Sequence, residues 1–154
     1  MRDILFRGKR LDNGEWVYGF YCHVPRGRLD RDEHLIQTVK KSGKMGMLHC
    51  VDPSTVGQYT GLKDKNGKRI WEGDIIRSHY ANTRKNDFVE QVVFHNGRFC
   101  SLYKITGPGN GKIWANLPDG VQHLPKDKTP YMEWCEARGN IHDNSELLED
   151  DIDE

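Results

Sequence analysis

Hydrophobic and polar residues alternate in short runs along this chain, and turn-forming residues separate the runs. A period of about two residues is that of a β-strand with one buried face. Asn-Gly dipeptides, which favour tight hairpin turns, recur at residues 13–14, 66–67, 96–97 and 110–111. No window of the sequence sustains the apolar spacing of a long helix. The pattern predicts a mainly β fold, or β-rich α+β at most, built from antiparallel hairpins.

The central stretch, residues 51–77, contains the clearest hairpin of the chain. A three-residue loop that ends in glycine predicts that Asp64 lies opposite Lys68. The same register places Leu62 and Ile70 together on one face of the hairpin. A buried ribbon at the centre of the fold is the expected result.

Two turns flank this central hairpin. Pro53 favours a single helical turn that starts near Asp52. On the other side, Glu72-Gly73-Asp74 bends the chain into an apolar run, and turns of this shape often open SH3-like or OB-like barrels. The domains expected from these signals are an N-terminal hairpin subdomain (1–50), a central hairpin with an SH3-like barrel portion on one core (51–148), and a disordered acidic tail (149–154).

The first hairpin, residues 4–24, turns at Asn13-Gly14. A two-residue loop would place Phe6 opposite Tyr21, and a three-residue loop would place Phe6 opposite Phe20. A slip of one residue exchanges the two faces of a strand, so the register that gathers the apolar side chains is favoured. We expect the three-residue loop. The residues then expected to share one buried face are Ile4, Phe6, Trp16, Tyr18 and Phe20.

The formal net charge is zero, yet the two halves of the chain differ. Residues 1–77 contain 15 Lys and Arg against 10 Asp and Glu, whereas residues 78–154 contain 8 against 13. Such an asymmetry is typical of a solvated surface of two signs, and it also suits contact between subunits or a modest basic face. The sequence shows no apolar run of the ~20 residues that span a bilayer, and no signal-peptide pattern. We expect a cytoplasmic protein without membrane contact.

Four cysteines, Cys22, Cys50, Cys100 and Cys135, are widely spaced and form no Cys-x-x-Cys pair. Reduced thiols are expected from this spacing. Cys22-His23 and His49-Cys50 would give zinc two thiolates and two imidazoles if their segments paired. Neighbours on a strand point to opposite faces, however, so ordinary cysteine and histidine are the preferred interpretation.

Other candidate chemistry is equally well explained by structure. The Cys50–His49 and Cys100–His95 neighbours lack a third group that would orient the base. Residues 107–112 are rich in glycine but lack the spacing of a phosphate-binding loop. Glu72 and Asp74 suit a turn that bonds its own backbone. We therefore expect no enzyme activity and no cofactor or metal.

Three motifs then carry a resemblance to a known family. They are Ile4-Leu-Phe-Arg-Gly8 with Gly14-Glu-Trp-Val-Tyr-Gly19, the run Thr55 to Ile75, and Arg138-Gly-Asn-Ile-His-Asp-Asn-Ser-Glu-Leu-Leu148. In order and spacing the chain resembles the YopX family of phage and prophage proteins over nearly its whole length. Trp71 stands where the family usually has tyrosine, and Ser145 where proline is common.

The resemblance implies a β-rich fold of two intertwined parts with an SH3-like barrel portion. It also implies a phage-encoded protein that works in the host cytoplasm and associates with itself. The biochemical activity of the family is not established, so no catalytic residue is implied for this chain.

Two classes of partner remain for such a protein. Exposed strand edges and halves of opposite charge favour a homo-oligomer, or docking to an unknown host or phage protein. The alternative is nucleic acid, with Tyr59 and Trp71 as stacking faces beside a basic central hairpin. The basic residues of this candidate nucleic-acid site are Lys63, Lys65, Lys68, Arg69 and Arg77, and the first hairpin adds Arg7, Lys9 and Arg10.

Overall fold

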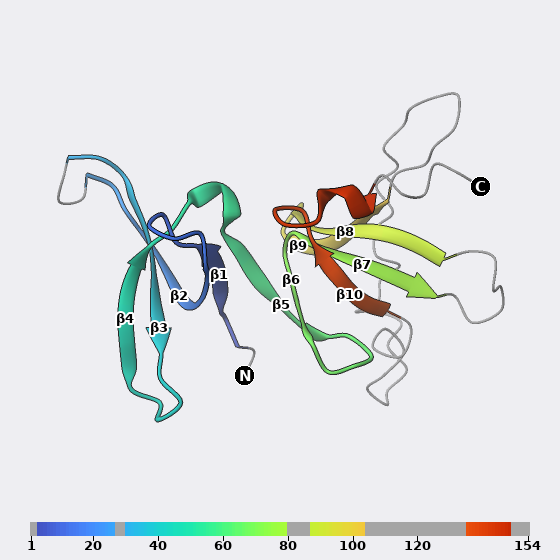
Figure 1. Ribbon diagram of the computed structural model, residues 1–154, viewed down its shortest axis with the longest axis horizontal. Coiled ribbons are helices and arrows are strands. Elements are labelled where there is room, and N and C mark those ends of the chain that lie inside the picture. The colour runs from blue at the N-terminus through green and yellow to red at the C-terminus, as the bar shows by residue number, and fades with distance from the viewer. Residues whose placement is uncertain (1–2, 27–29, 80–86, 104–134, 149–154) are drawn as a thin grey trace. The chain divides into compact units, whose positions relative to one another are not determined.

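The protein is built from short β-strands, as the sequence predicts (Figure 1). The computed structural model describes residues 3–26, 30–79, 87–103 and 135–148. These residues form two antiparallel sheets, and their helical segments are single 3₁₀ turns. The mainly β class is therefore confirmed, whereas an SH3-like barrel portion stays a prediction. The glycine-rich run 107–112 and the acidic tail lie outside the described residues.

Two compact units make up the chain, Met1–Gly61 and Leu62–Glu154, and they divide later than the boundary expected after residue 50. The first unit holds β1 (Phe6–Lys9), β2 (Trp16–Val24), β3 (Glu33–Val39), β4 (Met45–Cys50), η1 (Pro53–Thr55) and most of β5 (Gly57–Lys63). The second holds β6 (Arg69–Trp71), β7 (Asp74–His79), β8 (Asp87–His95), β9 (Arg98–Tyr103), β10 (Cys135–Asn140) and η2 (Ser145–Leu148). The strand orders are β4-β3-β2-β1-β5-β6 and β10-β7-β8-β9.

The register predicted for the first hairpin was wrong. Phe6 lies opposite Gly19, because the loop contains four residues instead of three. The amide of Arg10 donates to the carbonyl of Glu15 at 2.9 Å, and the amide of Gly14 donates to the carbonyl of Arg10 at 2.9 Å. Gly14 has a φ of 71°, which suits a residue without a β-carbon. The fourth loop residue shifts every side chain of β2 relative to the expected pairing.

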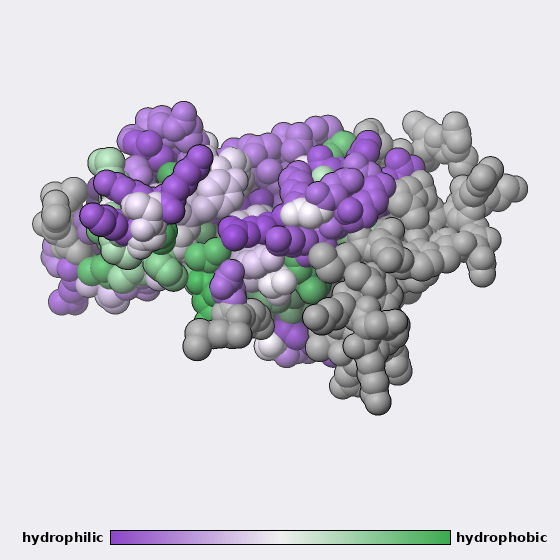
Figure 2. All heavy atoms as spheres, turned by 90° about the horizontal axis from the view of Figure 1, so that it is seen from below, coloured by the Kyte–Doolittle hydropathy of each residue, from purple (hydrophilic) through white to green (hydrophobic). Residues whose placement is uncertain are grey.

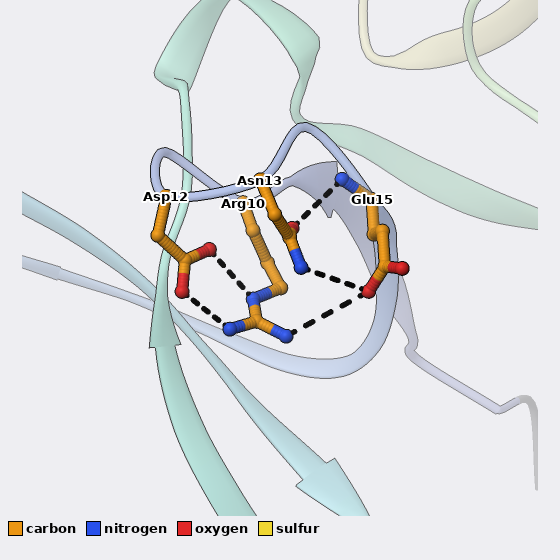
Figure 3. A network of polar contacts seen from close by, with 4 residues as sticks. All are labelled: Arg10, Asp12, Asn13 and Glu15. Atoms are coloured by element: carbon orange, nitrogen blue, oxygen red, sulfur yellow. Dashed lines mark hydrogen bonds and ion pairs between the residues drawn. The ribbon is translucent and has the colours of Figure 1, made fainter.

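Side chains of the loop itself stabilise this longer turn (Figure 3). The guanidinium of Arg10 bonds both carboxylate oxygens of Asp12 and lies 3.8 Å from the carboxylate of Glu15. The side-chain oxygen of Asn13 accepts a 3.0 Å bond from the amide of Glu15. The bond to Asp12 is the main cause of the raised pKa of Arg10. These local bonds fit the four-residue turn, and the observed register places Phe6 on the same face as the buried Ile36.

The expected buried face is consequently divided between the two sides of the sheet. The ring of Phe6 packs against that of Tyr21, with centroids 5.4 Å apart. Trp16, Tyr18 and Phe20 lie on the opposite face, where the guanidinium carbon of Arg7 is 4.7 Å from the Trp16 ring centroid. Tyr18 and Phe20 are each 48% exposed, so their predicted burial was wrong.

The core of the first unit lies on the Phe6 side of its sheet. Ile36 and Val51 are buried there, and both would meet a β-carbon added at Gly8. An isolated bridge pairs Arg10 with Val51, so the end of β1 meets the chain just after β4. Asp52 caps η1 by accepting a 2.9 Å bond from the amide of Ser54, which confirms the predicted helical turn.

The second unit gathers its apolar residues between β6, β7, β8 and β10. Its core consists of Ile70, Ile76, Val92, Cys135 and Ala137, with Leu62 packed against them. The predicted grouping of Leu62 with Ile70 is confirmed. The hairpin of β8 and β9 closes through a two-residue turn at Asn96-Gly97, with both residues at positive φ. This is the turn type that Asn-Gly favours.

Candidate interaction surface

Asp64 is the structural centre of the second unit. Its carboxylate is 2% exposed and accepts bonds from the amides of Asn66, Lys68 and Ala137 at 2.9, 2.9 and 3.0 Å. The first two bonds close the predicted three-residue loop, and the third ties the loop to β10. A carboxylate whose oxygens both accept backbone N–H groups stabilises a fold, and it has little capacity left for acid–base chemistry.

Residues of the other two motifs also make hydrogen bonds and close contacts that stabilise the fold. Asp74 is buried and accepts a 2.9 Å bond from the amide of Trp71, as a turn that bonds its own backbone should. The amide of Ile141 donates to the carbonyl of Gly73 at 2.9 Å, which joins the closing motif to this turn. A β-carbon at Gly139 would lie 2.5 Å from the side-chain oxygen of Asn144. The motifs therefore specify turns and close contacts.

Two of the basic residues predicted around the central hairpin contact β10, and the site as a whole stays a prediction. Lys65 pairs with Glu136 at 3.0 Å, and this bond is the main cause of the lowered pKa of Glu136. The ammonium of Lys68 donates to the carbonyl of Ala137 at 3.4 Å. These two side chains thus contact β10. The remaining three lie on three strands: Lys63 ends β5, Arg69 starts β6 and Arg77 lies in β7.

The first unit instead presents a broad apolar surface that the sequence did not predict. The register places Phe20, Gln37 and Leu48 side by side across three strands, because directly paired residues share a face. We call the face of the sheet that carries this row the outer face. Figure 2 shows hydrophobic residues gathered among hydrophilic ones on one side of the molecule. The side chains that define the outer face are Arg7, Lys9, Trp16, Tyr18, Phe20, Cys22, Leu35, Gln37, Leu48 and Cys50.

Cysteine and histidine separate onto the two faces of this sheet. Cys22 and Cys50 both lie beside Leu35 on the outer face, and both are exposed. The rings of His23 and His34 stack on the other face with centroids 4.5 Å apart. Within the residues that the structure describes, no three His, Cys, Asp or Glu side chains gather as a metal site would need. Segments 22–23 and 49–50 each pair with β3 and not with each other, and alternation along the strands separates the thiols from the imidazoles.

The histidines contact aromatic and acidic neighbours instead. The hydroxyl of Tyr21 and Nδ1 of His34 are 2.6 Å apart, and Nε2 of His23 lies 3.4 Å from a carboxylate oxygen of Asp32. Burial is the main cause of the raised pKa of Tyr21. This row of rings runs across β2 and β3 and stabilises their pairing through packing and one short hydrogen bond.

The strand β4 forms one edge of the first sheet and pairs, as a strand, only with β3 among the described elements. Its large side chains are exposed: Met45 to 57%, Met47 to 70% and Leu48 to 51%. The sequence has no charged residue between Lys44 and Asp52. Sheet edges are usually protected by charge, proline or a covering segment. The lack of charge from residue 45 to 51 was the sequence signal that could have revealed this edge.

Comparison with known proteins places the chain in a family. The family model described as YopX protein matches residues 5–149. The chain belongs to the YopX family. A solved neighbour in fold is protein EF1440 from Enterococcus faecalis, which is 22% identical over 96% of this chain and 99% of that one, with a TM-score of 0.52. At this identity the likeness shows the fold alone. A search of the curated proteins finds no match.

The described part of this YopX protein has no helix that is long and apolar enough to cross a membrane. The strongest candidate for function is a surface of the first unit. It has two parts that meet at Leu48: the outer face of the sheet and the edge strand β4.

Proposed function

We propose that this YopX protein is a non-catalytic accessory protein, encoded by a phage or prophage and active in the host cytoplasm, that works by associating with itself. The observation that supports the proposal best is the edge strand β4, with its exposed Met45, Met47 and Leu48 and its lack of charge. The carbonyl of Cys50 on this edge already accepts a 3.1 Å bond from the amide of Leu11, so the part open to a partner runs from Met45 to Leu48. An open, apolar strand edge offers backbone groups to a second strand. The proposed partner is a second copy of the same strand.

The backbone groups of β4 that point away from β3 fit such pairing. The amide of Val51 donates to the carbonyl of His34 on β3 at 2.8 Å. Backbone groups alternate sides along an antiparallel strand, so those of His49 also face β3 and those of Leu48 face the free edge. Two β4 strands related by a two-fold axis would bond antiparallel, each supplying the same residues. The two sheets would then form one continuous sheet.

Charge favours the antiparallel arrangement. Between His34 and Val51 the chain has three lysines, Lys40, Lys41 and Lys44, and no acidic residue. The open end of the same hairpin carries Glu33, with Asp52 next to it in the extended β3–β4 register. Antiparallel pairing brings the lysine-rich turn of one copy towards the acidic end of the other. Opposite charges at both ends favour the two-fold register over a parallel one.

The test is the mass of the protein in solution. Light scattering after size exclusion should give at least twice the monomer mass of 17.8 kDa for the native chain. Leu48→Lys places a charge on the free edge in both copies and should shift the mass to that of the monomer. The matched control is Phe94→Lys, because Phe94 is also 51% exposed but lies in the second unit. That variant should keep the native mass.

Circular dichroism of both variants reports whether the fold is intact. A folded native chain that is monomeric at high micromolar concentration would refute self-association. An oligomer that survives Leu48→Lys but is lost in Phe94→Lys would place the contact in the second unit and overturn the β4 assignment.

A further inference from the structure

The outer face of the first unit carries aromatic side chains in a row along one strand. Trp16, Tyr18 and Phe20 are every second residue along β2 and therefore point to the same side of the sheet. Residues two apart on a strand are separated by about 7 Å. Tyr18 and Phe20 are each 48% exposed, which is unusual for two adjacent aromatic rings on a sheet. A row of exposed rings at this spacing offers flat surfaces to planar ligands.

Cations flank one end of this row. The ammonium of Lys9 lies 5.5 Å from the Trp16 ring centroid, and beneath it the guanidinium carbon of Arg7, a residue only 6% exposed, lies 4.7 Å from the same centroid. The basic β3–β4 turn with Lys40, Lys41 and Lys44 follows Val39 at this same end of the sheet, because β3 runs antiparallel to β2. Cationic groups therefore converge on the end where the aromatic row begins.

Acidic groups are distributed differently. Glu33 pairs with Val24 at the far end of β2, four residues beyond Phe20. The carboxylates of Asp12 and Glu15, in the loop before Trp16, are already engaged by Arg10. Residues 1–61 contain 10 Lys and Arg against 7 Asp and Glu, so the unit has an excess of positive charge. The ligand that complements this face is a polyanion with aromatic groups.

We propose that the outer face, through Tyr18, Phe20 and Lys9 together with the lysines of the β3–β4 turn, binds single-stranded nucleic acid. Bases stack on exposed aromatic side chains of a sheet while neighbouring cations hold the phosphates, and such binding needs little base-specific contact. Duplex is excluded from this mode because its bases are already stacked and its grooves would have to receive a flat sheet. The site is distinct from the basic central hairpin, where Lys65 and Lys68 contact β10.

Binding and self-association are compatible on this geometry. The proposed two-fold axis at β4 would be perpendicular to the sheet, so the outer faces of two copies would lie on the same side. The nucleic-acid proposal does not depend on the dimer, because each copy carries the complete aromatic row. The native protein, diluted until light scattering shows a monomer, should therefore still bind, and this separates the two proposals.

The experiment is fluorescence anisotropy of a labelled thymidine oligomer of about 16 nucleotides, a length within the range covered by single sheet-based sites. The native protein should bind at low salt, with affinity falling as salt rises. Tyr18→Ala and Phe20→Ala should each weaken binding by about 5- to 150-fold, since each removes one stacking surface. Phe94→Ala, at a ring of similar exposure in the second unit, should leave the affinity unchanged.

The exposed thiols provide a second readout. Cys22 is two residues from Phe20 on the same face, so a bound strand should slow its alkylation by iodoacetamide. A duplex of the same sequence should protect Cys22 far less. The absence of binding at low salt, equal affinity for duplex, or unchanged affinity in both aromatic variants would each overturn the proposal. Loss of binding only in Lys63→Gln or Arg69→Gln would move the site to the central hairpin and refute it as well.

Discussion

Phe6 lies directly opposite Gly19, and this pairing decides which aromatic residues of the first hairpin are buried. The neighbouring Phe20 pairs with Gln37 of β3 on the outer face. Had Phe6 paired with Phe20, the same rings would have formed one buried cluster. The exposed aromatic row from which the nucleic-acid proposal starts is thus a consequence of one additional residue in the turn.

Gly19 also allows the two strands to approach, and we predict that Gly19→Ala is strongly destabilising. A β-carbon there would overlap the backbone carbonyl of Gln37, which cannot move without breaking the β2–β3 pairing. We expect a loss of about 2–3 kcal/mol in the free energy of unfolding, as for overpacking of a rigid site. Urea titration followed by circular dichroism measures this loss.

The control for that variant is Gly43→Ala. Gly43 has a φ of 78° and nothing within 4 Å of an added β-carbon, so only backbone strain opposes the change. Strain of this kind costs about 1–2 kcal/mol. Equal losses in the two variants would show that the close approach at Gly19 is unimportant.

A second prediction concerns Asp64. Asp64→Asn keeps the shape of the side chain but replaces one accepting oxygen by an NH₂ group, which would face a backbone N–H. Because the site is 2% exposed, water cannot compensate, and we expect a loss of roughly 2–3 kcal/mol in unfolding free energy. Glu136→Gln is the control, since its ion pair with Lys65 is partly exposed and its loss should lower the urea midpoint much less. Similar midpoints for the native chain and Asp64→Asn would contradict the assigned role.

The same glycine-turn reasoning succeeded in one hairpin and failed in another, and the reason is physical. At Asp64 the carboxylate bonds the amides of the three-residue loop, so local and hydrophobic preferences agree. At Arg10 the side chains of the loop bond one another in a four-residue loop, whereas the grouping of apolar side chains favoured a three-residue loop. A pattern of apolar residues cannot show which of the two terms is larger, because ion pairs in a loop depend on geometry.

The exposed edge was less accessible still to sequence reasoning. The lack of charge around Met45, Met47 and Leu48 is an indirect signal that a buried strand would also give, whereas the sheet order places β4 at the edge directly. The separation of Cys22 from His23 was predictable, because alternation along a strand is a local rule. The order of the strands in the sheet was not predictable, and this order decides whether a side chain lies in the core or on the surface.

A third prediction uses the cysteines as reporters of this arrangement. Cys22 and Cys50 are exposed, and Cys100 and Cys135 are buried. A thiol-specific reagent at pH 8 should therefore modify two of the four thiols quickly in the folded protein, and mass spectrometry should identify Cys22 and Cys50. In denaturant all four should react. Fast modification of Cys135 in the folded state would contradict the packing of β10.

The last prediction concerns alkaline pH and the second unit. Burial is the main cause that raises the pKa of Cys135 from 9.0 to about 12, with the charges of Asp64 and Glu90 acting in the same direction. The unfolded chain therefore loses this proton at lower pH than the folded one. A group of this kind contributes its full stability below pH 9, and the contribution falls as pH rises from there towards 12.

Cys135→Ala removes the titrating thiol and fills the site with a smaller apolar group. We expect the variant to be less stable at pH 7, because a buried atom is lost, yet to lose less stability between pH 9 and pH 10.5 than the native chain. Urea midpoints at these values measure the difference, and the other ionisable groups are common to both proteins. Parallel stability curves for the two proteins over this range would show that the thiol of Cys135 ionises as easily in the folded state as in the unfolded one.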